Sequence, residues 1–282
     1  MLSSSSRSDL VIATWNVLAA PWAAASFYPA AMDMAVLDRW VRAALVGAHA
    51  ATFGADVLCL QETTPPDLVP IVSHLSGYES FSTTNGRDLW SKWSKAEVAW
   101  EPNGTAIAWR VDAFDAITTG AVQLSDDGNI AAWMRARHVS SGRQVRILSV
   151  HFDADEAALR RAQLPVALGV FDAEPGCIDV VAGDCNEDTI ATDLGAICDA
   201  YQFVDALTIL GCTEPTHPYA RPSDDYAPIA RLDHVLVRGT WPISGAVIDA
   251  DVWPVDVPGE RMEEHLRRTG SDHLPVTVTV AT

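Results

Sequence analysis

The feature that most constrains this chain is a series of short apolar runs that each end in an acid, an amide or an imidazole. One run is Val180-Val181-Ala182-Gly183-Asp184-Cys185-Asn186, and another extends from residue 56 to Gln61-Glu62. Apolar runs of this length, bounded by polar and turn residues, are typical of buried strands. In layered α/β folds, polar groups at the ends of several strands can converge in one crevice. The pattern therefore predicts a sheet-based fold with its chemistry gathered at strand ends.

The side chains at these ends suit metal-assisted hydrolysis. Asp184 and Asn186 end one run, and Asp272 and His273 follow a glycine turn near the end of the chain. Divalent cations such as Mg²⁺ prefer oxygen ligands, and an attacking water needs a carboxylate or imidazole to take its proton. We therefore expect a hydrolase that uses Mg²⁺ or Mn²⁺.

Strand geometry predicts where neighbouring side chains point. Asp184 and Asn186 are two residues apart, so on an extended backbone they share one side, while Cys185 faces the other side and packs. Asp272 and His273 are adjacent and diverge, which allows one to face a metal and the other a phosphate.

The periodicity of apolar residues predicts many strands and few helices. A helix is expected over residues 35–51, with Asp33 as its N-cap and an apolar stripe that includes Trp40 and Val41. A second helix is expected over about 155–170, where Pro165 predicts a kink or an early stop. Strands are expected near residues 10–15, 57–60, 105–109, 131–139, 145–152, 178–182, 232–237, 246–255 and 275–280.

Length and composition favour one domain. The chain has 282 residues, 49% of them hydrophobic, which is enough for one large core over residues 1–282, with residues 1–9 as a flexible tail. We expect no transmembrane segment and no signal peptide, because no long uncharged apolar stretch occurs. The five cysteines are scattered and never spaced as C-x-x-C, which argues against disulfides or a zinc site and favours a cytoplasmic protein.

The formal net charge of −18 bears on the partners. Proteins that bind long nucleic acids through their phosphates usually present a basic face, so tight nonspecific binding to duplexes is not expected. A local basic patch remains compatible with this charge, and some of the acids can be offset by a bound metal.

Six short motifs resemble the endonuclease/exonuclease/phosphatase superfamily, which has the DNase I-like fold. A single Gly-Asp-x-Asn recurs by chance, but here the motifs follow the family's order from about residue 10 to about residue 280. They are Thr14-Trp15-Asn16, Leu60-Gln61-Glu62, Ser149-Val150-His151, Gly183-Asp184-Cys185-Asn186, Arg231-Leu232-Asp233-His234 and Ser271-Asp272-His273.

The resemblance implies an α/β fold, a four-layer sandwich of two packed, mainly antiparallel sheets flanked by helices. It also implies that Glu62 binds Mg²⁺ or Mn²⁺ with help from Asn16 and Asp272. A turn-forming Asn16 and a surface Glu62 are the structural alternatives for these two residues.

The resemblance also implies a catalytic set. Asp184 orients or deprotonates the attacking water, and Asn186 holds that water or a phosphate oxygen. His151 contacts the scissile phosphate or assists the leaving group, and Asp233 steadies His273 as an imidazolium near a developing oxyanion.

Other residues are candidates for substrate binding. Trp90 and Trp93, with lysines nearby, could stack a base and touch its phosphate, although tryptophans packed in a lid or helix are the favoured alternative. Arg267 could contact an anionic substrate or lie on a solvated face. His234 stands where the family usually has an aromatic residue and is expected to pack. Further histidines lack motif support and are treated as non-catalytic: His49, His74, His138, His217 and His265.

Within the superfamily, the N-terminal motifs are most similar to the deadenylase and nocturnin branch. This similarity favours a nuclease acting on single-stranded RNA or a nucleotide. A phosphomonoesterase or phosphodiesterase for a small molecule is an alternative that suits the acidic charge. A catalytically inactive binding module is a third alternative, which is disfavoured because all the expected catalytic positions are occupied.

Overall fold

The architecture comes from a computed structural model, which describes residues 9–28, 32–85, 101–126, 128–172, 174–188, 193–217, 230–239, 241–248 and 258–281. The predicted tail, apart from residue 9, and the segment that contains Trp90 and Trp93 lie outside these residues.

Over the described residues, the strands form two six-stranded sheets. The first sheet has the order β11 (Ile243–Ile248), β12 (Val276–Val280), β1 (Leu10–Asn16), β2 (Val57–Thr63), β4 (Gly104–Arg110) and β3 (Tyr78–Ser82). The second has the order β5 (Phe114–Gln123), β6 (Ile130–His138), β7 (Arg143–His151), β8 (Ile178–Asp184), β10 (Asp233–Arg238) and β9 (Val204–Asp205).

Each sheet has one parallel strand pair at its centre, and its other pairings are antiparallel. β1 pairs with β2 and β7 pairs with β8 in parallel, and the helices α1 (Arg39–Ala50) and α4 (Ala157–Leu168) make the crossovers. The register places Asn16 opposite Gln61 and His151 opposite Asp184. The carboxyl ends of these four strands therefore carry the polar residues that the sequence singled out.

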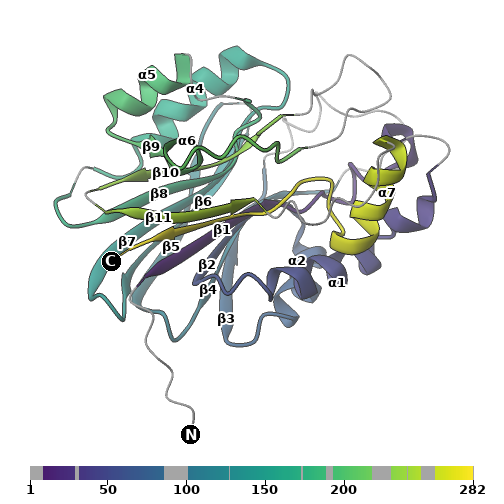
Figure 1. The fold of residues 1–282 in the computed structure, drawn as a ribbon, viewed down its shortest axis with the longest axis horizontal. Coiled ribbons are helices and arrows are strands. Elements are labelled where there is room, and N and C mark those ends of the chain that lie inside the picture. The colour runs from purple at the N-terminus through teal and green to yellow at the C-terminus, as the bar shows by residue number, and fades with distance from the viewer. Residues whose placement is uncertain are drawn as a thin grey trace, which may run out of the picture.

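The two sheets pack face to face and helices cover their outer faces (Figure 1). The core between the sheets includes Ile12 and Ile107 from the first sheet and Ile147 and Val180 from the second. α1 and α2 (Pro65–Ser73) cover the first sheet, whereas α4 and α5 (Asp193–Ala200) cover the second. These observations confirm the predicted four-layer sandwich of two mainly antiparallel sheets, each with one parallel strand pair.

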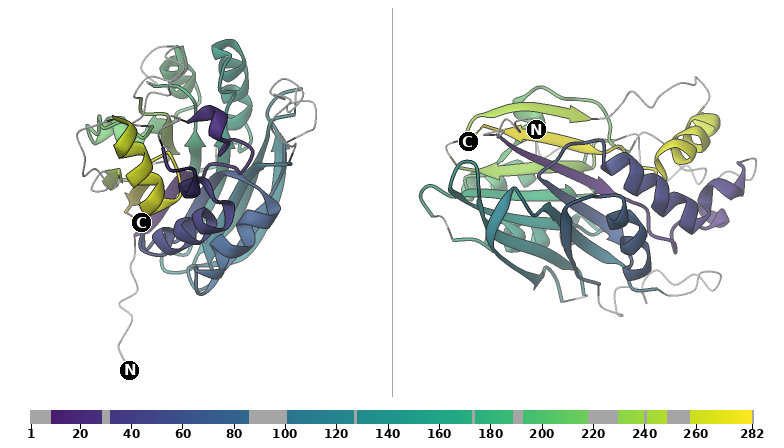
Figure 2. Two further views of the ribbon diagram at one scale, coloured as in Figure 1. Left: turned by 90° about the vertical axis from the view of Figure 1, so that its right-hand side faces the viewer. Right: turned by 90° about the horizontal axis from the view of Figure 1, so that it is seen from below.

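The remaining helices lie around the ends of the sheets. α7 (Pro258–Thr269) lies beside α1, as the view from below shows (Figure 2), and packs with the short helices η1 (Ala25–Phe27) and η2 (Met34–Leu37). α6 (Ala206–Ile209) follows β9. None of the described helices combines the length and apolar character needed to span a bilayer. All five cysteines are free, and four of them are buried.

The first helix differs from its prediction. Asp33 caps only the short helix η2, and Asp38 begins α1 by accepting hydrogen bonds from the backbone N–H groups of Trp40 and Val41. This second start changes the phase of the helix, so Trp40 is 57% exposed and Val41 53% exposed. The predicted apolar stripe was therefore wrong at Trp40 and Val41, and the buried face of α1 consists of Arg42, Ala43, Val46, Gly47 and Ala50.

The second helix agrees with its prediction in position. α4 contains Pro165 and continues past it to Leu168, so the helix does not stop at the proline.

Gly183 is required by close packing in the second sheet. It lies opposite Val150 on β7 and His234 on β10. A Cβ atom at this position would lie 1.9 Å from the Val150 carbonyl oxygen, a backbone atom that cannot rotate away. The glycine next to Asp184 therefore allows β8 to lie between its neighbours.

We predict that Gly183→Ala destabilises the protein by about 1–3 kcal/mol or more, because the new methyl group overlaps the backbone of β7. Urea unfolding measures the change. Gly245→Ala is the matched control, since a Cβ at that strand glycine meets no atom within 4 Å. Equal unfolding midpoints for the two variants would contradict the packing argument.

Candidate active site

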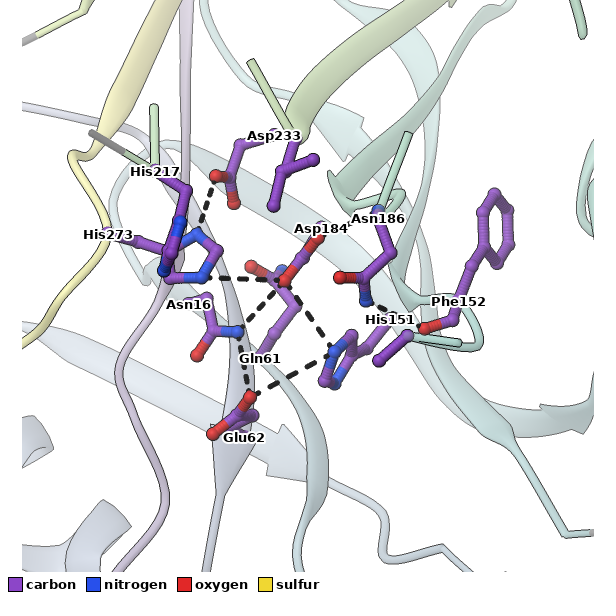
Figure 3. Close-up of polar contacts among 12 residues, drawn as sticks. Asn16, Gln61, Glu62, His151, Phe152, Asp184, Asn186, His217, Asp233 and His273 are labelled. Atoms are coloured by element: carbon purple, nitrogen blue, oxygen red, sulfur yellow. Dashed lines mark hydrogen bonds and ion pairs between the residues drawn. The ribbon is translucent and has the colours of Figure 1, made fainter. Parts of the chain in front are cut away.

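Four polar side chains from the two sheets meet at the strand ends (Figure 3). The Asn16 Nδ2 atom donates to Glu62 Oε1 and to Asp184 Oδ2, both at 3.0 Å. His151 completes the group, with its Nε2 atom 4.0 Å from Glu62 Oε1 and 3.6 Å from Asp184 Oδ2. One amide thus joins a carboxylate of the first sheet to a carboxylate of the second.

The backbone adopts an unusual conformation at or near the residues that carry these side chains. Glu62 and Asn186 both have left-handed backbone, with φ of 57° and 50°, and so does Leu18 at 57°. This region costs energy for residues other than glycine, and such conformations cluster at functional sites.

Hydrogen bonds within the site hold these turns. The backbone N–H of Ala19 donates to Glu62 Oε2 at 2.9 Å. Beyond β8, the backbone N–H of Asn186 donates to Asp184 Oδ1 at 2.8 Å, and its side-chain amide donates to the Phe152 carbonyl at 3.0 Å. The Glu62 carboxylate therefore stabilises the loop after β1, and the Asp184 carboxylate stabilises the turn that follows β8.

His273 forms a buried pair with Asp233, as the resemblance implied. Its Nδ1 atom lies 2.8 Å from Asp233 Oδ2, and its Nε2 atom lies 3.8 Å from Asp184 Oδ2. Burial of the ring favours the neutral form, but the charges of Asp233 and Asp184 outweigh it and raise the pKa of His273 to about 10. The ring is therefore an imidazolium at neutral pH, with Nε2 directed toward the other site residues.

The main chain of His273 is anchored to β1 and α7. Its carbonyl accepts a hydrogen bond from Trp15 Nε1 at 2.8 Å and lies 3.2 Å from His265 Nε2. Its N–H donates to Ser271 Oγ, which in turn donates to the Asn16 carbonyl at 2.6 Å. These hydrogen bonds fix the position of the turn at residues 271–273 relative to the end of β1.

Arg42 strengthens this connection from α1. Its buried guanidinium donates to the Leu18 carbonyl and to the Gly270 carbonyl, both at 2.9 Å. Burial lowers the pKa of Arg42, while Tyr28 and Asp272 are among the nearby groups that favour its charge. One side chain therefore joins the loop after β1 to the turn before Asp272.

The donor set fits a hard divalent cation. Glu62 and Asp184 accept hydrogen bonds from the same amide nitrogen, so the two carboxylates lie close together and repel each other. Both residues offer oxygen donor atoms, which Mg²⁺ and Mn²⁺ prefer. Asp184, Asp233 and His273 also bring ligand atoms within 4.8 Å of one another, but the short bond to Asp233 engages His273 Nδ1. Glu62 and Asp184 thus give the site two neighbouring carboxylates whose charge a bound divalent cation would offset.

Asp272, the third predicted metal ligand, makes contacts with two further residues. The Tyr28 hydroxyl donates to Asp272 Oδ2 at 3.3 Å, and His217 Nε2 lies 4.0 Å from the same oxygen. Its role as a metal ligand stays a prediction.

The structure places Arg267 on α7 with partners of its own. Its side chain is 51% exposed, and its guanidinium forms ion pairs with Glu263 at 2.7 Å and with Asp33 at 3.4 Å. These pairings are those of a solvated helix face, and the prediction of a substrate contact gains no support from them.

His217 was not recognised from the sequence, and it lies against the site. Its ring centroid is 4.8 Å from that of His273, and the residue is only 2% exposed. Its position depends on the preceding Thr216, whose hydroxyl accepts hydrogen bonds from the backbone N–H groups of Leu232 and Asp233. No short motif contains such a long-range contact.

Comparison with known proteins identifies the family. The sequence profile of the Endonuclease/Exonuclease/phosphatase family matches residues 13–273. The chain belongs to this family. Among curated protein sequences, none matches the chain.

Solved structures of several family members have the same fold. Human nocturnin's catalytic domain, with a bound sulfate anion, is 19% identical, with a TM-score of 0.67 and coverage of 97% of this chain and 94% of that one. A mannosyl-6-phosphatase from Bacteroides thetaiotaomicron is 19% identical, with a TM-score of 0.65 and coverage of 97% and 100%. ANGEL2, a 2′,3′-cyclic phosphatase bound to adenosine-2′,3′-vanadate, is 13% identical, with a TM-score of 0.70 and coverage of 96% and 95%. At these identities, the likeness shows the fold.

We predict that Asp233→Asn lowers the pKa of His273 and changes how stability depends on pH. In the folded wild type, His273 keeps its proton up to about pH 10, whereas in the unfolded chain it loses the proton near 6.5. Unfolding between these values releases a proton, so the stabilisation is complete below pH 6.5 and is lost as the pH rises toward 10.

Denaturant unfolding between about pH 7 and pH 9 tests this, because a single such group gives a slope of up to about 1.4 kcal/mol per pH unit. The wild type is expected to lose stability more steeply than Asp233→Asn. Parallel curves for the two proteins would show that Asp233 does not hold the His273 proton.

Proposed function

We propose that this protein is a phosphoesterase that depends on Mg²⁺ or Mn²⁺ and hydrolyses a phosphodiester by in-line attack of water. The observation that supports it is the convergence of Glu62 and Asp184 on the side chain of Asn16, with His151 and His273 near Asp184. Membership of the Endonuclease/Exonuclease/phosphatase family supports the same class of reaction.

In this proposal, Glu62 holds the ion with help from Asn16 and Asp272. A bound ion supplies Lewis-acid polarisation of the phosphate and stabilises the leaving oxygen. Asn16 also fixes the rotation of the Glu62 carboxylate, since its amide donates to Oε1 while the Ala19 N–H donates to Oε2.

Asp184 is the proposed general base. Its Oδ1 atom accepts from the Asn186 N–H, which leaves Oδ2 facing Asn16, His151 and His273. A carboxylate fixed in this way can take a proton from a water placed for attack. The imidazolium of His273 donates to a phosphoryl oxygen through Nε2, because Asp233 engages Nδ1. His151 and Asn186 are proposed to contact the remaining phosphoryl oxygens or the leaving group.

Single-stranded RNA or a nucleotide is the proposed substrate. Similarity of the N-terminal motifs to the nocturnin branch supports it, and structures with the same fold include nocturnin and a D. rerio TDP2 complex with single-strand DNA product.

The cytoplasm is the proposed location of the protein. Its cysteines are free, which suits that reducing compartment.

A small phosphate ester is the second candidate substrate. The net charge of −18 weakens attraction to long polyanions but matters less for a compact ester that is recognised within the site. The mannosyl-6-phosphatase of the same fold provides a precedent of this kind.

We predict phosphate-ester hydrolysis in Mg²⁺ or Mn²⁺ that a chelator abolishes. Asp184→Asn is expected to lower kcat by about 10²–10⁴, because the amide cannot accept the proton of water. Asp115→Asn is the control, since that exposed aspartate pairs with Arg137 on the second sheet. Equal activity with and without chelator would exclude the metal-dependent reaction, and an active Asp184→Asn would exclude its role as the base.

End-labelled single-stranded RNA distinguishes the two substrate classes. The proposed nuclease gives shorter products whose pattern reports the cleavage polarity, and it leaves duplex RNA largely intact. Intact single strands combined with phosphate release from a nucleotide or sugar phosphate would move the assignment to small esters. Failure of every ester in Mg²⁺ and Mn²⁺ would favour the inactive binding module.

A further inference from the structure

His217 is buried beside two side chains of the site, the His273 ring and the Asp272 carboxylate. The family resemblance assigns no role to His217. Its ring is tilted by 57° against that of His273, with centroids 4.8 Å apart. Its Nε2 atom lies 4.0 Å from Asp272 Oδ2, the oxygen that also accepts from the Tyr28 hydroxyl. Figure 3 shows the His217 ring directly beside His273.

The backbone of His217 is fixed from two directions. It forms a bridge with Ala230, close to the start of β10. The preceding Thr216 accepts from the Asp233 N–H through its hydroxyl, and its carbonyl accepts from the Leu274 N–H at 2.7 Å. The segment thus binds both Asp233 and the residue that follows His273, so its position is coupled to that of the catalytic pair.

We infer that His217 is a positioning residue that orients the Asp272 carboxylate toward the metal. The inference rests on the proposed function, in which Asp272 helps to hold the ion. His217 Nε2 and the Tyr28 hydroxyl face the same oxygen, so together they set the rotation of the carboxylate about its Cβ–Cγ bond. Hydrogen-bond partners that orient a metal ligand change the affinity of the site for the metal.

The chemistry of the side chain supports this role over simple packing. A phenyl ring would fill the same space beside His273 without the cost of burying a polar imidazole. The present separation from Asp272 exceeds a hydrogen bond by about 1 Å, and such contacts often tighten when a site is loaded. The imidazole therefore supplies a donor where a hydrocarbon ring would suffice for packing.

Two substitutions of His217 distinguish a role in packing against His273 from a role as a hydrogen-bond donor to Asp272. His217→Phe keeps a ring against His273 and removes the donor, whereas His217→Gln keeps a side-chain N–H donor without the ring. His138→Phe is the matched control, because His138 is also 2% exposed and packs on Phe114 away from the site. Mn²⁺ affinity by electron paramagnetic resonance, kcat, KM and the unfolding midpoint are measured for each protein.

We expect His217→Phe to weaken Mn²⁺ binding and to lower kcat by about 10- to 100-fold, with Gln restoring part of both. His138→Phe should leave Mn²⁺ affinity within about twofold of wild type, whatever its effect on the unfolding midpoint. Adding His217→Phe to Asp272→Asn should change Mn²⁺ affinity little further, since both act through one carboxylate.

Wild-type Mn²⁺ affinity and kcat in His217→Phe, or an effect undiminished in the Asp272→Asn background, would overturn the inference. If no phosphate ester is hydrolysed but Mn²⁺ affinity falls in His217→Phe, the proposed hydrolase fails and the positioning role stands. If hydrolysis occurs and both parameters are unaffected by His217→Phe, the proposed function stands and His217 is a packing residue.

Discussion

The hydrogen bonds from the Asn16 amide to Glu62 and Asp184 are the interaction on which the rest of the site depends. The two carboxylates belong to different sheets, so this single side chain fixes the distance between the layers at the point where the chemistry is proposed. Asn16 is itself fixed, because its carbonyl accepts from Ser271 and its side-chain oxygen accepts from the Leu18 N–H. Positioning of this precision is what a rigid sheet offers and a loop does not.

Each sheet contains one β-α-β unit. A parallel strand pair linked by a crossover helix lies at the centre of each layer, first as β1-α1-β2 and again as β7-α4-β8. Asn16 and Glu62 come from the ends of the first unit, and His151 and Asp184 come from the ends of the second. The site is therefore the meeting of two similar halves, and a disturbance of the packing between the sheets would reach all four side chains at once.

The sequence predicted local features well and distant contacts poorly. The buried strands that carry Glu62 and Asp184 at or near their ends could be predicted, because each depends on its own apolar run. The exposed side of α1 could not, because Asp38 restarts the helix and shifts its phase, so that Trp40 faces solvent. His217 was missed because its place beside His273 depends on backbone contacts between segments that no short motif records. The pairing of Asp233 with His273 was recognised through the family resemblance rather than through spacing.

The left-handed backbone at Glu62 and Asn186 links the proposed chemistry to the protein's tolerance of mutation. Glycine enters that region without a steric cost, so a chain selected for stability alone would favour glycine at both positions. This chain has a carboxylate and an amide at these positions, against that local preference. In a lineage released from selection for activity, replacements at these two positions would relieve backbone strain while removing the chemistry. Such a lineage is expected to keep its sheets and to lose these two side chains early.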